Sequence, residues 1–319
     1  MNDLSGLNLG FFGTPDFSLE FLKYLYKENA KILYVVSQPP SISGRGKKIK
    51  FSPVHDWALK KNINVYTPKS INDQQIMKEI QSQKTDINVV VAYGKIINEI
   101  ILNAPNFFSI NVHASLLPRW RGAAPIQRAI LAGDLITGVS IMKVEKKLDA
   151  GPVIEKKKIK IERDDTSGTL CQKIIDYGKD LLIVSLKKIV DNKAKMEFQD
   201  EKKATYAEKI EKKETKINWS DSAESINLKI RAFNPYPGAW TNLQDMQTQT
   251  RVKILDAIVL DNCEELSDEK IYPGSVSGSL VVKCGLRYLR INELQKQGKN
   301  KIKAKEFLNG IKSKKFFFE

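Results

Sequence analysis

The first half of the chain alternates short apolar runs with stretches of helical pattern, and this alternation constrains the fold more than any other feature. The apolar runs LNLGFF, ILYVV, INVVVA and FFSINV occupy residues 7–12, 32–36, 87–92 and 107–112. Each is followed by a segment of helical pattern, at residues 17–27, 53–62, 95–102 and 125–131. This order predicts an α/β fold with a parallel sheet wrapped by helices, in which ligands bind beyond the carboxyl ends of the strands.

The second half of the chain changes character after one long helical segment. Residues 166–190 carry the pattern of a single helix, and residues 190–212 are then polar and charged with few large apolar side chains. Beyond them, short strand-like runs are separated by Gly, Pro and Asn, which predicts a small β-rich domain, best described as a barrel. We therefore expect a larger domain at 1–189, a linker at 190–212 and a C-terminal domain at 213–319, in keeping with about 100 to 200 residues per domain.

The chain is strongly basic, with 52 Lys and Arg residues against 37 Asp and Glu residues and a formal net charge of +15. Such a charge concentrates polyanions such as nucleic acid near the surface. Residues 39–50 hold four basic side chains and no acidic one, and residues 287–319 hold ten basic and three acidic side chains. A coding bias that fills solvated surfaces with lysine explains either patch equally well, so both are candidates for contact with nucleic acid.

Several classes of protein are excluded by what the sequence lacks. No apolar run approaches the roughly 18 residues that span a membrane, and the N-terminus lacks the pattern of a secretory signal. The three cysteines, Cys171, Cys263 and Cys284, are far apart and form no CxxC pair, so we expect no disulfide framework, no zinc site and no other metal. We accordingly expect a cytoplasmic protein with no membrane partner, and a monomer because no heptad repeat is evident.

Imidazole chemistry has two candidates, because His55 and His113 are the two histidines of the chain. His55 lies in a segment of helical pattern and is expected to be a surface or boundary residue. Asn111 and His113 end an apolar strand, whose alternation puts both side chains on one face. A turn-capping Asn beside a buried, hydrogen-bonded His explains this pattern as well as a functional site does.

No phosphate-loop, HExxH or GxSxG motif occurs, and GRGKK at 44–48 lacks the third glycine of a dinucleotide-binding fingerprint.

Five segments together resemble one family. They are FFGTPDFS at 11–18, GRGKK at 44–48, NVHASLLPRWRGAAPIQ at 111–127, LDAGPV at 148–153 and FLNG at 307–310. In this combination the chain resembles the methionyl-tRNA formyltransferase family of folate-dependent formyltransferases over nearly its whole length. The resemblance implies a Rossmann-like formyltransferase catalytic domain followed by a small OB-like barrel that binds tRNA. It also implies transfer of a formyl group from 10-formyltetrahydrofolate to the α-amino group of methionyl initiator tRNA, for translation initiation.

The resemblance assigns site residues by position. The catalytic set is Asn111, His113 and Asp149, and Asp149 stands in LDAG where the family form is LDTG. An amine that attacks a formyl carbonyl passes through a tetrahedral oxyanion, for which an Asn amide and an imidazolium supply two donors. Asp149 would orient the imidazole and help to remove the amine proton, whereas on its own it would be assigned as a turn residue. The folate is expected along the loop made of Ser115, Leu116, Leu117 and Pro118.

Contacts with tRNA are expected from the basic loop at 38–52, through Arg45, Lys47 and Lys48, with a solvated loop as the alternative. Phe17 is a candidate to pack against the methionine side chain, and a core position on an amphipathic helix is an equal alternative. Two tryptophans, Trp120 and Trp240, are expected to be packing residues. The basic tail of the C-terminal domain offers weaker candidates, namely Lys299, Lys301, Lys303 and Lys305.

Three other functions remain open from the sequence. A folate-dependent formyltransferase acting on another amine, such as a purine precursor or an amino sugar, is the nearest alternative, and the second domain, the charge and GRGKK favour tRNA over it. An RNA-binding protein with a decayed formyl-transfer site would not need Asn111, His113 and Asp149. A hydrolase of formyltetrahydrofolate would use water in place of the amine and would release formate without an acceptor.

Overall fold

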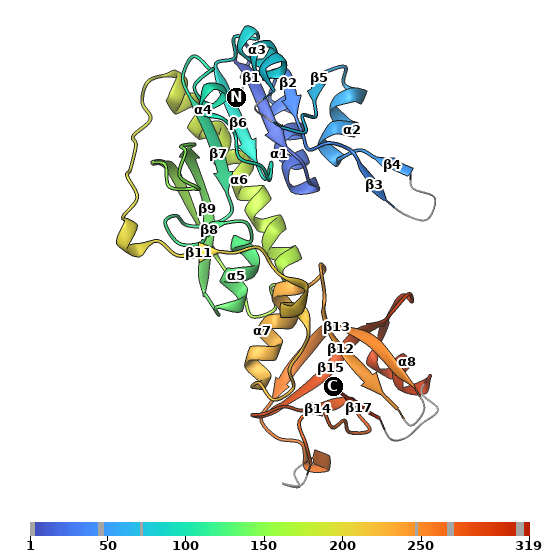
Figure 1. Cartoon of the computed structure of the whole chain (residues 1–319). Helices are drawn as coiled ribbons and strands as arrows, with labels where there is room; N and C mark the ends of the chain where they lie inside the picture. The colour runs from blue at the N-terminus through green and yellow to red at the C-terminus, as the bar shows by residue number, and fades with distance from the viewer. Residues whose placement is uncertain (1–3, 44–47, 71–72, 246–247, 267–270, 311–315) are drawn as a thin grey trace. The chain divides into compact units, whose positions relative to one another are not determined.

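The computed structural model describes residues 4–43, 48–70, 73–245, 248–266, 271–310 and 316–319. The chain forms two compact units (Figure 1). The first comprises Met1–Pro125, Ile136–Lys160 and Cys171–Glu208, and the second comprises Ile126–Leu135, Ile161–Leu170 and Lys209–Glu319. Of the helices in the described ranges, none combines the length and the apolar composition needed to cross a membrane.

The first unit is built on a seven-stranded sheet with the strand order β10-β9-β7-β6-β1-β2-β5. The five strands from β5 to β7 run parallel, and β9 and β10 each run antiparallel to their neighbours. The strands are β1 Asn8–Gly13, β2 Lys31–Val36, β5 Asn64–Tyr66, β6 Ile87–Val91, β7 Ser109–His113, β9 Ile136–Lys143 and β10 Val153–Lys160. The mixed α/β fold with a mostly parallel sheet is therefore confirmed.

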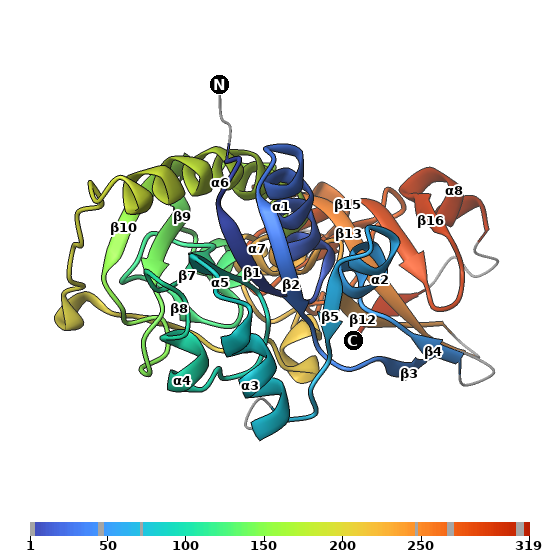
Figure 2. The same ribbon diagram turned by 90° about the horizontal axis from the view of Figure 1, so that it is seen from above.

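Helices cover both faces of this sheet. Figure 2 shows α1 and α6 on one face and α3 and α4 on the other. The strand order reverses between β1 and β6, and in open α/β sheets such a reversal opens a crevice for ligands at the carboxyl ends of the strands. The helices are α1 Asp16–Lys27, α2 Pro53–Lys60, α3 Gln74–Ser82, α4 Glu99–Leu102, α5 Pro125–Leu131 and α6 Ser167–Val190.

The central strands are apolar on both sides because helices cover both sides. All five residues of β6 are buried. Phe12 of β1 meets the rings of Tyr34 and Tyr93 edge to face, at centroid distances of 6.1 and 5.8 Å. The polar residue Asn88 is accommodated among them because its Oδ1 accepts a hydrogen bond of 2.6 Å from the hydroxyl of Tyr34. This core fixes the strand ends that carry the site.

The second unit is built mainly of antiparallel strands, in agreement with the β-rich prediction, and its described residues also include α7, α8, most of α5 and the start of α6. Its sheet has the order β14-β15-β13-β12-β17, with β16 paired to β15. Single bridges between Ser275 and Phe317 and between Val276 and Val282 connect the β17 side to the β14 side, so the sheet curls into a half-barrel. The elements are α7 Ala223–Phe233, β12 Ala239–Gln244, β13 Gln249–Leu260, β14 Val281–Lys283, β15 Tyr288–Lys296, β16 Lys301–Lys303, α8 Ala304–Asn309 and β17 Phe317–Phe318.

The polar segment that follows α6 is bound along the first unit as far as residue 208. Glu197 and Val153 exchange two backbone hydrogen bonds of 2.8 Å. Farther on, β11 (Tyr206–Ala207) pairs in parallel with β8 (Arg121–Gly122). A short 3-10 helix, η1 Glu201–Lys203, interrupts the segment, and a second, η2 Lys212–Thr215, follows it in the second unit. Residues 191–208 are thus held by regular backbone contacts although their composition is that of a linker.

Candidate active site

Asn111 and His113 lie at the carboxyl end of β7, which neighbours β6 in the sheet. Ile110 and Val112, which alternate with them, are 0 % and 3 % exposed and belong to the core. His113 is also buried, at 5 % exposed, and Asn111 is partly exposed. The alternation of the strand therefore puts the amide and the imidazole on one face, as expected from the sequence.

Asp149 reaches the same place from the loop between β9 and β10. Its Oδ1 accepts a hydrogen bond of 3.3 Å from Nδ2 of Asn111, and its Oδ2 accepts one of 2.9 Å from the backbone N–H of Gly122. The Nδ1 atom of His113 lies 3.6 Å from Oδ2 of Asp149, which makes an ion pair when the imidazole is protonated. The structure thus brings the three candidate catalytic residues together.

The orientation of the His113 ring is fixed from its other side. Nε2 of His113 lies 2.8 Å from the carbonyl oxygen of Trp120. Because a carbonyl can only accept, this contact requires the hydrogen on Nε2. The backbone N–H of Trp120 in turn donates to Oγ1 of Thr205, at 2.9 Å. Nδ1 is then the ring atom that faces Asp149.

The four predicted folate residues divide into two buried and two accessible ones. Ser115 is 0 % exposed and its hydroxyl donates to the carbonyl of Arg119, at 2.6 Å. Leu117 is 2 % exposed and packs in a small apolar cluster beneath the loop. Leu116 and Pro118 are partly exposed, so they offer the surface of the loop while Ser115 and Leu117 support it.

The loops at the ends of β1, β2 and β6 are tied together by polar side chains that the sequence analysis did not single out. The carbonyl oxygen of Tyr93 accepts from Thr14 Oγ1 at 3.0 Å and from Gln38 Nε2 at 2.8 Å. Thr14 lies in the GTPD loop, but no pattern marked Gln38 or the backbone of Tyr93. These bonds hold the loops together at the point where the strand order reverses.

Phe17 and His55 differ in accessibility. Phe17 is partly exposed at the start of α1, and its ring contacts that of the core residue Phe21 at 5.2 Å. The expectation of a surface or boundary position for His55 is wrong, since the residue is only 8 % exposed beneath the ring of Phe51, 4.4 Å away. Burial lowers the pKa of His55, which favours a neutral packing residue.

The tRNA candidates of the basic loop are only partly covered by the structure. Arg45 and Lys47 lie outside the described residues, and Lys48 begins strand β4 (Lys48–Lys50), which pairs with β3 (Ser41–Ser43), without a described side chain. The two tryptophans are in contact with arginines of the chain itself. The guanidinium carbons of Arg119 and Arg251 lie 4.4 and 3.6 Å from the ring centroids of Trp120 and Trp240.

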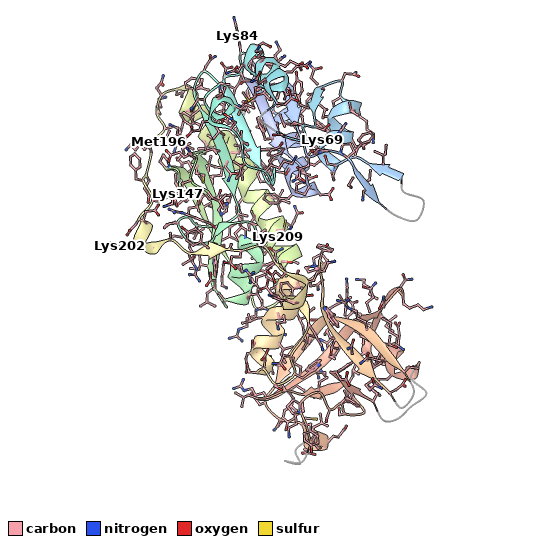
Figure 3. The ribbon with its side chains drawn as sticks, viewed as in Figure 1. Lys69, Lys84, Lys147, Met196, Lys202 and Lys209 are labelled. Atoms are coloured by element: carbon pink, nitrogen blue, oxygen red, sulfur yellow. The ribbon has the colours of Figure 1, made fainter. Side chains whose placement is uncertain are left out.

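A buried arginine precedes Gly122, whose backbone N–H binds Asp149. Arg121 is 0 % exposed, and its guanidinium binds Glu201 through Nη1 at 3.2 Å and Nη2 at 2.9 Å. The hydrogen bonds from Arg121 and Lys147 lower the pKa of Glu201 to about 2. Figure 3 labels Lys147 in the loop after β9 and Lys202 beside Glu201 in η1. The RWRG run could have pointed to Arg121, but nothing in the polar segment pointed to Glu201.

Comparison with known proteins decides the family. The formyl transferase family model matches residues 8–186, and the model of the formyl transferase C-terminal domain matches residues 209–312. A curated methionyl-tRNA formyltransferase from Methylococcus capsulatus is 41 % identical over 306 residues, which is 95 % of this chain and 96 % of that protein. The chain belongs to the methionyl-tRNA formyltransferase family. The recognition made from the sequence motifs is confirmed.

Solved structures with the same fold include proteins crystallised with folates. HypX from Aquifex aeolicus in complex with tetrahydrofolic acid matches with a TM-score of 0.65 and 15 % identity, over 96 % of this chain and 48 % of that chain. The chain therefore spans about half the length of HypX. An N-formyltransferase from Helicobacter canadensis in complex with folinic acid and dTDP-3-aminofucose matches with a TM-score of 0.63 and 18 % identity, over 89 % and 99 % of the two chains. At these identities the likeness shows the fold.

Proposed function

We propose that this member of the methionyl-tRNA formyltransferase family transfers the formyl group of 10-formyltetrahydrofolate to the α-amino group of methionyl initiator tRNA, with Asn111, His113 and Asp149 as its catalytic residues. One observation carries the proposal. The carboxylate of Asp149 lies 3.3 Å from the amide of Asn111 and 3.6 Å from the imidazole of His113, at the end of the strands where sheets of this type bind ligands.

The reaction makes one C–N bond and breaks another. The amine nitrogen attacks the formyl carbon, and the carbonyl oxygen becomes a tetrahedral oxyanion. Collapse of this intermediate breaks the bond to N10 of the folate, which takes up a proton as the amine nitrogen loses one. The site must therefore stabilise negative charge on one oxygen and move one proton.

Asn111 and His113 supply the donors for the oxyanion. The Asn111 amide carries two N–H groups, of which one is directed to Asp149. The other serves the formyl oxygen. His113, held through Nε2 by the carbonyl of Trp120, donates from Nδ1 when it is protonated. Removal of one such donor costs on the order of 10²- to 10³-fold in turnover.

Asp149 is the proton acceptor and the counter-charge of His113. Its Oδ1 accepts one bond, from Asn111, and retains a further lone pair, whereas Oδ2 accepts from Gly122 and also faces Nδ1 of His113. A carboxylate with an unused lone pair beside the attacking amine takes the amine proton directly or through a water molecule. No other described acid contacts both Asn111 and His113 in the hydrogen bonds and ion pairs of the site.

The folate and the tRNA are bound outside this cluster. We infer that the folate lies along the loop 115–118, where Leu116 and Pro118 are accessible and Ser115 and Leu117 are the support. Arg45, Lys47 and Lys48 contact the tRNA backbone, because a basic loop next to the crevice is suited to phosphates. Phe17 packs against the methionine side chain, and the C-terminal half-barrel provides a further basic surface for the RNA.

Formylation of charged tRNA tests the proposal. The protein is incubated with 10-formyltetrahydrofolate and methionyl initiator tRNA, and formyl-methionine is measured for wild type and Asn111→Ala, with methionyl elongator tRNA as control. We expect transfer to the initiator that the substitution lowers on the order of 10²- to 10³-fold. Transfer to amino sugars or free amines without transfer to either tRNA would assign another acceptor, and formate release without an acceptor would assign hydrolysis.

A further inference from the structure

Gln199 connects the loop that carries Asp149 to the side chain of Arg121 in β8. Its Nε2 donates to the backbone carbonyls of Asp149, at 2.9 Å, and Gly151, at 2.7 Å. Its Oε1 accepts from Nε of Arg121, at 3.0 Å. Both N–H groups of the amide are therefore used, and the orientation of the amide is determined, because the reversed amide would point its oxygen at two carbonyls.

The anchor on the other side of Gln199 is rigid. Arg121 is fully buried, and both of its terminal nitrogens bind the Glu201 carboxylate. Lys147 of the Asp149 loop binds the same carboxylate at 2.5 Å. A bidentate arginine pair of this kind restrains the guanidinium in position and in plane. Gln199 is thus held by a group that cannot move freely.

Arg121 also lies in sequence between two residues whose backbone groups bind His113 and Asp149. The carbonyl of the preceding residue, Trp120, binds Nε2 of His113, and the N–H of the following residue, Gly122, binds the carboxylate of Asp149. The Gln199 bridge therefore links the backbone of the Asp149 loop to the strand that orients the His113 ring.

Asp149 needs such support because its backbone is unfavourable by itself. Its φ is +48°, in the left-handed region that is strained for a non-glycine residue and persists only where the surroundings enforce it. Gln199 binds the carbonyl of Asp149 itself and that of Gly151 two residues on. The bridge thus acts on the peptide groups that define the strained conformation.

We propose that Gln199 is a positioning residue for formyl transfer, which sets the Asp149 carboxylate against Asn111 and His113 by binding the backbone of its loop. The inference rests on the proposed function. A displacement of about 1 Å in a catalytic group can cost about 10²-fold. Loss of the two donors at Gln199 is therefore expected to lower kcat by about 10- to 100-fold. The KM for the folate should change by less than about 3-fold, because Ser140 and not Gln199 supports the loop 115–118.

The variant Gln199→Glu tests this inference, because it keeps the shape and the acceptor for Arg121 but removes both N–H donors. Gln81→Glu, at an exposed position of α3, is the matched control and should leave kcat unchanged. Thermal unfolding establishes that each variant folds. If Gln199→Glu does not fold, Gln199→Met, which is similar in size and also lacks the donors, takes its place.

A double-mutant cycle separates positioning from a general effect on structure. In the background of Asp149→Asn, we expect Gln199→Glu to lower the residual single-turnover rate by less than about 2-fold, because the group it positions is already removed. An equal loss in both backgrounds, or a change confined to KM, would overturn the inference. Hydrogen exchange of residues 144–152 gives a readout without activity, and unchanged exchange in Gln199→Glu would also overturn it.

Wild-type activity distinguishes failure of the proposed function from failure of the positioning role. If the wild type does not formylate methionyl-tRNA, the proposed function fails, and the exchange measurement still decides whether Gln199 holds the loop. If the wild type is active and Gln199→Glu retains full kcat, the proposed function stands and the positioning role fails.

Discussion

At the residue scale, the site depends on backbone conformations that few side chains tolerate. Trp120, Gly122 and Asp149 have φ angles of +63°, +119° and +48°. The carbonyl of Trp120 binds His113, the N–H of Gly122 binds Asp149, and Asp149 is itself one of the proposed catalytic residues. Left-handed backbone is costly and tends to gather at functional sites, so the three positions together are in keeping with the proposed role of the cluster.

Replacement of Gly122 by alanine should destabilise the first unit. A Cβ at this position would lie 2.8 Å from the backbone oxygen of Ala207, and φ is +119°. We expect Gly122→Ala to lower the free energy of unfolding by about 2 to 3 kcal/mol, through strain and through displacement of the β8–β11 pair. Gly298→Ala is the control, because φ is +73° there and nothing lies within 4 Å of the added Cβ. Equal losses in urea titrations of the two variants would contradict the prediction.

The Arg121–Glu201 pair predicts a pH dependence of stability. Hydrogen bonds from Arg121 and Lys147 lower the pKa of Glu201 from 4.5 to about 2. Because the folded state holds this proton more weakly than the unfolded state, the pair stabilises the fold above pH 4.5, and its contribution is lost as the pH falls towards about 2. In denaturant titrations from neutral to acidic pH, wild type should exceed Glu201→Gln in stability near neutrality, and the difference should shrink below pH 4.5. If the difference in stability between wild type and Glu201→Gln does not change with pH, the Arg121–Glu201 pair does not cause the pH dependence of stability.

At the element scale, the sequence predicts the helices and strands that bury apolar side chains, but it misses a polar segment that is held by hydrogen bonds. The long helix at 166–190 is confirmed as α6 Ser167–Val190, because its apolar positions repeat with the helical period. Asn111 and His113 share a face because strands alternate. By contrast, residues 191–208 are polar, and their contacts with the first unit run through the backbone of Glu197, the amide of Gln199 and β11. Composition cannot reveal such contacts, so the boundaries 1–189, 190–212 and 213–319 stay a prediction.

Hydrogen exchange can test whether residues 197–205 behave as an element or as a linker. The amides of Glu197, Lys203, Ala204 and Thr205 donate to backbone carbonyls at 2.8 to 3.3 Å. We expect them to exchange more slowly than an unstructured peptide, by on the order of 10-fold or more, because bonded amides exchange only through local opening. Residues 194–196 serve as the internal comparison, because their amides donate to no backbone carbonyl of the described residues. Equally fast exchange in both stretches would support a linker.

At the scale of the whole molecule, the net charge of +15 gives the chain a long-range attraction for polyanions. This attraction has no sequence specificity and decreases with salt, because each neutralised phosphate releases bound counterions. Selection of a methionyl tRNA must therefore come from local contacts at the site, while the affinity comes largely from basic side chains. The two contributions can be separated by replacing basic residues with neutral ones at two different places in the first unit.

Removal of the basic loop charges should weaken tRNA binding more than removal of the same charge elsewhere. Arg45→Gln, Lys47→Gln and Lys48→Gln together are compared with a control that neutralises Lys27, Lys31 and Lys84. These controls are exposed and lie near the amino ends of β2 and β6, at the edge of the sheet opposite the site.

Both triple variants lower the net charge by the same amount, so a purely long-range effect would weaken binding equally. We expect the loop variant alone to flatten the plot of log association constant against log salt, by about one unit for each lost phosphate contact. Binding of methionyl tRNA across a range of salt concentrations measures this slope. Parallel plots for the two variants would place the phosphate contacts outside the loop. A flatter plot for the loop variant, with an unchanged rate at saturating substrate, would assign the loop to tRNA binding rather than to the chemical step.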